Sequence, residues 1–140
     1  MRVICLAISA ALFGFSVNTS TASNIVVKLD DHAHPVCGYY GASGGMTLSL
    51  IAAAKVGDRN ARAKVESDYA AVRQSYSGQL RNIYGLSTTA LMRSIDSNAT
   101  ERAIDAAEAG YGAKGVKDFE LALANECQAM GVDTFVASLA

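Results

Sequence analysis

Residues 116–130, VKDFELALANECQAM, carry the amphipathic pattern around which the rest of the chain can be arranged. Their apolar side chains recur at intervals of three or four, as they do on one face of an α-helix. These residues are Val116, Phe119, Leu123, Cys127 and Met130. The pattern therefore predicts a helix that turns Cys127 towards the protein core.

The same spacing occurs around a second cysteine far away in the sequence. Cys37, Tyr40, Gly44, Leu48 and Ile51 are separated by three, four, four and three residues, so Cys37 is expected on the inner face of another helix. We predict that a Cys37–Cys127 disulfide joins the two helices. It would close a loop of about 90 residues, for which chain entropy predicts roughly 4 to 5 kcal/mol of stabilisation. The alternative is a pair of buried free thiols.

The first residues have the pattern of a signal peptide. Met1 and Arg2 precede an uncharged apolar run over residues 3–17, and small polar residues follow to position 23. The run is shorter than the roughly 20 apolar residues that a membrane span needs. We expect residues 1–23 to be cleaved together with Cys5, so that a mature chain begins near Asn24. The product would be periplasmic or secreted, without stable membrane insertion, in a compartment where disulfides form.

The remaining periodicity predicts an all-α fold, a small bundle of four main helices with one or two short ones. Residues 24–34 are expected to form an extended arm and residues 35–140 the helical domain. Pro35 suits the first turn of a helix over residues 35–56, although the four glycines in that segment disfavour a helix. Asp58 is a suitable N-cap for a long helix ending at Tyr84.

Apolar residues along that long helix form the longest uninterrupted stripe of the sequence and are expected to face inward: Ala61, Val65, Tyr69, Val72, Tyr76, Leu80 and Ile83. Beyond it, the pattern predicts two separate helices. A short one begins at residue 87 or 88, and a capping box of Asn98 and Glu101 opens the next, which should present Ile104 and Tyr111 to the core. The helix over residues 115–130 and a last short helix capped by Asp133 complete the bundle.

Charge is unevenly distributed along the expected mature chain. It has 11 basic and 13 acidic residues from position 24 onward, a balance that predicts no general attraction to nucleic acid. Residues 55–93 contain seven basic and three acidic side chains, whereas residues 96–133 contain three basic and eight acidic ones. One interpretation is complementary helix faces packed against each other. The other is a basic surface that attracts an acidic partner, formed by Arg59, Arg62, Arg73 and Arg81.

A possible metal site lies in the predicted arm. His32 and His34 are two residues apart, so in an extended segment both imidazoles point the same way, with Asp31 as a third ligand for copper or zinc. The alternative is a solvated linker, since these are the only two histidines of the chain and no further cofactor is indicated.

Catalytic motifs are missing from the sequence. It has no phosphate-binding loop, dinucleotide fingerprint or haem-attachment motif, and its carboxylates stand in no recognisable catalytic context. The sequence therefore favours a non-catalytic exported protein that acts by binding an envelope protein, as an inhibitor, an immunity-type factor or a stress chaperone. A metal-binding envelope protein is the second hypothesis.

Overall fold

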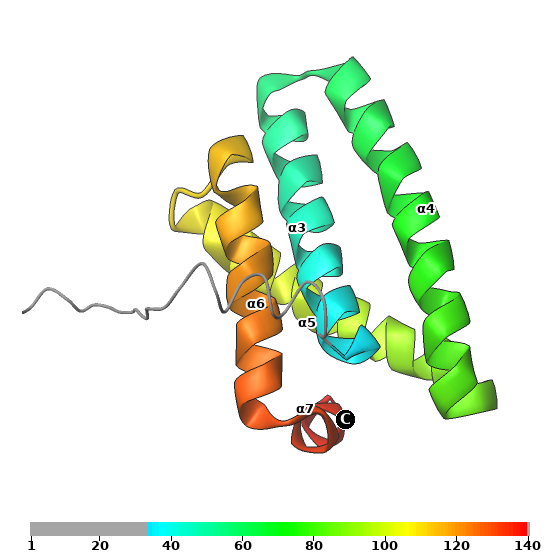
Figure 1. The fold of residues 1–140 in the computed structure, drawn as a ribbon. Helices are drawn as coiled ribbons and strands as arrows, with labels where there is room; N and C mark the ends of the chain where they lie inside the picture. The colour runs from blue at the N-terminus through cyan, green and yellow to red at the C-terminus, as the bar shows by residue number, and fades with distance from the viewer. Residues whose placement is uncertain (1–33, 140) are drawn as a thin grey trace, which may run out of the picture. The chain divides into compact units, whose positions relative to one another are not determined.

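The computed structural model describes residues 34–139, in which α-helices are joined by short turns (Figure 1). The helices are α3 (Pro35–Val56), α4 (Arg59–Tyr84), α5 (Thr88–Glu108), α6 (Val116–Met130) and α7 (Val132–Ser138), with 3-10 turns η1 (Gly85–Ser87) and η2 (Ala113–Gly115). No strand occurs within this range. The predicted all-α bundle of four main helices and a short one is confirmed, while the expected leader and nearly all of the arm lie outside the described residues.

Helix α3 is the central element of the bundle. The most extensive helix–helix contacts are those of α3 with α4, α5 and α6, and in Figure 1 it lies between α4 and α6, with α5 crossing behind it. Both of its ends follow from the sequence. His34 accepts a hydrogen bond from the Val36 N–H, and Pro35 occupies the first turn. Gly57 then ends the helix with φ of 68°, a conformation that glycine adopts without strain.

The glycines that disfavour a helix on propensity serve packing in α3. A Cβ at Gly41 would lie 2.6 Å from the backbone carbonyl oxygen of Glu120, and a Cβ at Gly44 would collide with the Leu123 side chain. Both of these neighbours belong to α6. The small residues therefore let the two helix backbones approach closely enough to join through their cysteines.

Substituting Gly41 tests this close approach. The added methyl group of Gly41→Ala would meet a backbone oxygen, which cannot rotate away, so we expect the free energy of unfolding to fall by about 1 to 3 kcal/mol despite alanine's better helix propensity. Gly78→Ala in α4 is the matched control, because nothing lies within 4 Å of a Cβ there. It should raise the free energy of unfolding by up to about 1 kcal/mol. Urea unfolding followed by circular dichroism measures both. Equal effects of the two substitutions would contradict the close approach.

The predicted disulfide between Cys37 and Cys127 is present. The sulfur atoms are 2.08 Å apart and the two Cα atoms 5.3 Å apart, and both residues are completely buried. The disulfide links α3 to α6 inside the main core cluster. The two repeats of residues that contain Cys37 and Cys127 therefore face the core as predicted, except that Met130, at the end of α6, is 48% exposed.

The expected break between two helices at Asn98 is wrong, because α5 runs unbroken from Thr88 to Glu108. Its buried stripe continues through the supposed boundary and is made largely of small residues: Met92, Ile95, Ala99, Ala103 and Ala106. Alanines suit this stripe because α5 packs closely against α3. Their low hydrophobic signal hid the continuity of the helix.

Two residues that were expected inside the bundle lie outside it. Ile104 is 44% exposed on α5, and Tyr111 is 53% exposed in the turn after that helix. The turn forms at Gly110, whose φ is 101°. Tyr111 instead lies against Phe119 in an edge-on arrangement, with 6.5 Å between ring centroids.

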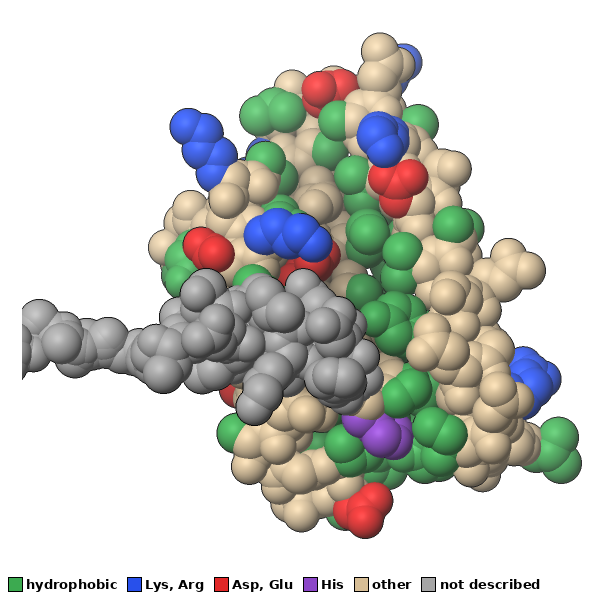
Figure 2. All heavy atoms as spheres, in the orientation of Figure 1, with side chains coloured by type: hydrophobic (Ala, Val, Ile, Leu, Met, Phe, Trp, Pro, Cys, Tyr) green, Lys and Arg blue, Asp and Glu red, His purple; other side chains and the backbone are tan. Residues whose placement is uncertain are grey.

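Helix α4 follows the predicted span, with Asp58 as its N-cap, but it is only partly covered. Leu80 is its one fully buried residue, and Ile83 of the predicted inner stripe is 51% exposed. Figure 2 shows hydrophobic side chains gathered along the seam between α3 and α4 on the visible face. Within residues 34–139, no helix combines the length and apolarity needed to cross a membrane.

Candidate functional site

A cluster of polar side chains joins α3, α4 and α5. Asp96 of α5 accepts hydrogen bonds on Oδ1 from the Tyr39 hydroxyl at 2.6 Å, the Ser43 hydroxyl at 2.9 Å and the Tyr69 hydroxyl at 3.3 Å. Arg73 of α4 forms a salt bridge with Oδ2 and also donates to the Tyr39 hydroxyl at 2.6 Å. We call these five residues the Asp96 cluster.

The cluster is built to hold helices together. Tyr39 and Ser43 are completely buried, so their hydroxyls depend on partners within the protein. Burial raises the pKa of Tyr39, and its hydrogen bond to Asp96 raises that pKa further. The hydrogen bond to Asp96 likewise raises the pKa of Arg73. Tyr39 therefore stays a neutral phenol and Arg73 a cation, and neither is available as a general base near neutral pH.

A second polar link connects α5 to α6. Arg102 donates to both carboxylate oxygens of Glu126, at 2.5 and 2.7 Å, and also to the Tyr40 hydroxyl at 3.3 Å. Arg102 and Glu126 are both in the half of the chain that is rich in acidic residues. Among residues 34–139, the Arg73–Asp96 pair is therefore the only salt bridge that joins the basic half of the chain to the acidic half.

The four arginines of the predicted basic surface lie on one side of α4 but differ in their surroundings. At about 100° per residue they project within an arc of about 100°, which borders the apolar stripe. Arg73 is committed to the Asp96 cluster, whereas Arg59, Arg62 and Arg81 are exposed. Arg62 lies 3.6 Å from Glu66 in a solvent-exposed pair, which contributes little energy. We call Arg59, Arg62 and Arg81 the arginine flank of α4.

No salt bridge to Arg59 or Arg81 occurs among residues 34–139. Their guanidinium groups therefore keep all of their donors for solvent or for a binding partner. The partner-binding role of these arginines stays a prediction.

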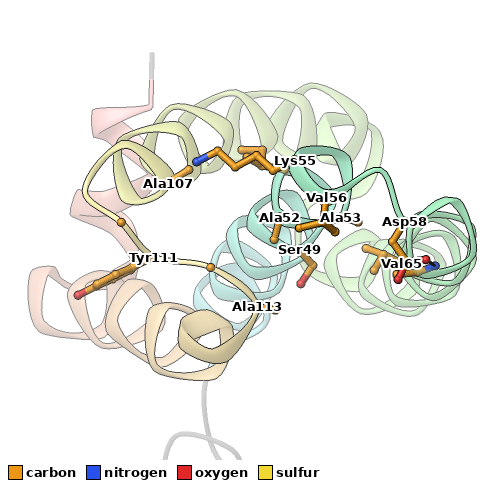
Figure 3. A pocket seen from close by; sticks show the side chains of 14 residues that line it. Ser49, Ala52, Ala53, Lys55, Val56, Asp58, Val65, Ala107, Tyr111 and Ala113 are labelled. Atoms are coloured by element: carbon orange, nitrogen blue, oxygen red, sulfur yellow. Dashed lines mark hydrogen bonds between the residues drawn. The ribbon is translucent and has the colours of Figure 1, made fainter.

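A pocket of about 500 Å³ opens where the C-terminal half of α3 faces the start of α4 and the turn after α5. Small residues dominate its wall, and Figure 3 shows the Lys55 side chain reaching across it towards Ala107 while the Tyr111 ring points away. The lining residues are Ser49, Ile51, Ala52, Ala53, Lys55, Val56, Asp58, Ala61, Val65, Ala107, Gly110, Tyr111, Gly112 and Ala113.

The predicted metal site falls mainly outside the described residues, since these begin at His34 and leave out Asp31 and His32. His34 uses Nδ1 to accept the Val36 N–H at 3.2 Å, which caps α3. Cys37 is held in the disulfide and cannot act as a thiolate ligand. Residues 34–139 contain no group of three or more histidine, cysteine or acidic side chains placed to hold a metal ion. Copper or zinc binding stays a prediction that rests on the arm.

Sequence reasoning missed Asp96 and the pocket. The only signals for the cluster were two polar pairs at helical spacing, Tyr39 with Ser43 and Tyr69 with Arg73, and nothing in the sequence says which carboxylate they share. The pocket had no signal, because it arises where small residues from distant segments fail to fill a space. Comparison of the chain with protein-family models, curated proteins and solved structures finds no match. Function must therefore be argued from the residues themselves.

Proposed function

We propose that this protein is an exported, non-catalytic module that binds an envelope protein through the arginine flank of α4. The observation that carries the proposal is the solvent exposure of α4. A helix of 26 residues with one fully buried side chain presents most of its surface to solvent, and two of its arginines have no acidic partner among the described residues. Such a surface offers cationic groups beside half-covered apolar ones, which is the composition of many interaction surfaces.

The helix is also tied to its neighbours by polar contacts, which favours binding. The Asp96 cluster fixes its middle to α3 and α5 through Tyr69 and Arg73, and the buried disulfide fixes α3 to α6. A preformed surface avoids part of the ordering entropy that association costs. An inhibitor, an immunity-type factor and an envelope chaperone would all use such a surface.

Electrostatics of the titratable groups agrees with a non-catalytic role. Among residues 34–139, the side chains with a displaced pKa are three tyrosines and two arginines, and in each the pKa is raised, away from neutrality. General acid–base catalysis uses groups whose pKa lies near the working pH. Export itself is proposed from the leader-like residues 1–23 and agrees with a disulfide, which forms in oxidising compartments.

Charge reversal tests the proposal. The triple variant Arg59→Glu, Arg62→Glu and Arg81→Glu should lower recovery of a specific partner from an envelope extract at least tenfold in low salt, where charge-driven contacts are strongest. A matched variant with the same change of net charge, Arg93→Glu, Lys114→Glu and Lys117→Glu, should retain that partner. Circular dichroism would establish that both variants are folded. Recovery of no specific partner, or equal recovery with both variants, would remove the proposal.

A further inference from the structure

The pocket between α3, α4 and the turn after α5 is a hollow that the chain leaves unfilled. Here a volume of about 500 Å³ is bordered by small residues from four separate segments, among them Ala53, Ala61, Ala107 and Gly112. Its size lies in the range of pockets that hold small organic ligands, roughly 300 to 1,000 Å³.

Apolar surface continues from the pocket to its mouth. Val56 lines the pocket and is 77% exposed. Exposed apolar residues that adjoin an apolar hollow are typical of a binding surface. An occupant would remove the Val56 side chain from water together with the wall of the pocket.

The wall favours an alkyl chain over a peptide. A peptide brings an N–H and a C=O group at each residue, and each needs a partner when it is buried. The pocket offers few side-chain partners. The Asp58 carboxylate already accepts the Ala61 N–H at 2.9 Å as the cap of α4 and the Tyr111 ring points away (Figure 3), which leaves the Ser49 hydroxyl and the Lys55 ammonium. An alkyl chain has no polar group to satisfy and matches the alanine-rich wall.

The charge of Lys55 favours an anionic head group on a ligand with such a chain. Its side chain extends across the pocket (Figure 3), and no salt bridge to it occurs among residues 34–139. Asp58, the other charged residue of the wall, uses one carboxylate oxygen to accept the Ala61 N–H and lies at the positive end of the α4 dipole, which attracts its charge. A carboxylate at the mouth would give the Lys55 ammonium a partner while the attached chain enters the pocket.

We propose that this pocket binds a single-chain amphiphile with a carboxylate head group, such as a fatty acid. The alkyl chain lies among the small residues of α3, α4 and the turn after α5, and the carboxylate pairs with Lys55. The site does not use the arginine flank of α4, so it stands or falls independently of the protein-binding role.

Calorimetric titration of the disulfide-bonded exported protein with dodecanoate, below its micelle concentration, tests the proposal. We expect saturable binding of one dodecanoate per chain. Dodecanol should bind about two- to fivefold more weakly, the range expected for loss of one exposed ion pair. Lys55→Gln should abolish this difference between the two ligands and leave the affinity for dodecanol unchanged.

The volume of the pocket is tested separately. Ala61→Phe places a ring in the wall and should weaken dodecanoate binding at least tenfold, whereas the matched control Ala63→Phe, on an exposed site of the same helix outside the wall, should not. If Ala61→Phe does not fold, Ala113→Phe fills the pocket from η2 instead. Absence of saturable binding, equal binding of dodecanoate and dodecanol, or full affinity in the filled variant would each overturn the proposal.

Discussion

Removing the Cys37–Cys127 disulfide should lower the free energy of unfolding by about 4 to 5 kcal/mol, the largest effect that we expect from any change in this chain. The cross-link closes a loop spanning 90 positions. It stabilises the fold by reducing the conformational entropy of the unfolded chain, and for a loop of this length the chain-entropy model gives a stabilisation of that size. A whole domain of this size is stable by only about 5 to 15 kcal/mol. The double variant Cys37→Ser and Cys127→Ser should therefore retain little folded protein near 37 °C.

Urea unfolding measures this effect, with the oxidised protein and the double variant compared under the same conditions. The matched control is the wild-type protein unfolded in the presence of a reductant, which breaks the cross-link without changing a core side chain. The reduced wild-type protein should lose about 4 to 5 kcal/mol, and the serine variant should lose that amount or more, since each serine places a hydroxyl at a completely buried position. A loss below about 1 kcal/mol in both forms would show that other contacts hold α3 to α6.

Replacing Asp96 should produce the second largest effect. Asp96→Ala removes the acceptor shared by Tyr39, Ser43 and Tyr69, and two of these residues are completely buried. Unsatisfied buried hydroxyls cost about 1 to 3 kcal/mol each, and relaxation of the cluster recovers part of that. We expect a loss of about 3 kcal/mol in the free energy of unfolding, measured in urea.

Arg73, the cationic partner of Asp96, should contribute less to the free energy of unfolding. The Arg73 side chain is 45% exposed, so its attraction to Asp96 is screened by water. Arg73→Met should cost about 1 kcal/mol. Asp105→Ala, at an exposed site of α5, is the control for Asp96→Ala and should change the free energy of unfolding by less than about 0.5 kcal/mol. If Asp96→Ala behaved like Asp105→Ala, the cluster would have no structural role.

The sequence predicted the features that depend on regular spacing along one helix. Cys37 and Cys127 each occupy a repeat of apolar residues three and four apart, so the inward direction of both could be inferred without any tertiary information. The N-cap at Asp58 and the end of α3 at Gly57 also follow from local chemistry. These parts of the fold were correctly predicted because their causes lie within a few residues of each other.

The errors arose where tertiary contact overrides the local signal. Asn98 and Glu101 have the spacing of a capping box, but Ala99 and Ala103 beside them are buried against α3, and that packing keeps α5 continuous. Tyr111 was expected in the core because it continues the helical spacing of Ile104 and Ala107. Its position is decided instead by the end of α5 at Glu108 and by the turn at Gly110.

The candidate sites depend on distant segments and were therefore mostly beyond sequence reasoning. Arg73 was assigned to the partner-binding surface because it belongs to the basic stretch over residues 55–93, and only the fold reveals that Asp96 lies beside it. The pocket likewise arises from small residues of four segments, none of which differs from an ordinary alanine or glycine in the sequence. Which cations stay exposed is thus a property of the fold.

The central claim, an exported helical bundle closed by a disulfide, is tested most directly by the intact mass of the protein recovered from cells without reductant. We predict a single product that has lost its leader and begins near Asn24, with a mass two hydrogen atoms below that of the same chain after reduction. Recovery of the uncleaved chain, or of a product whose mass does not change on reduction, would contradict the account.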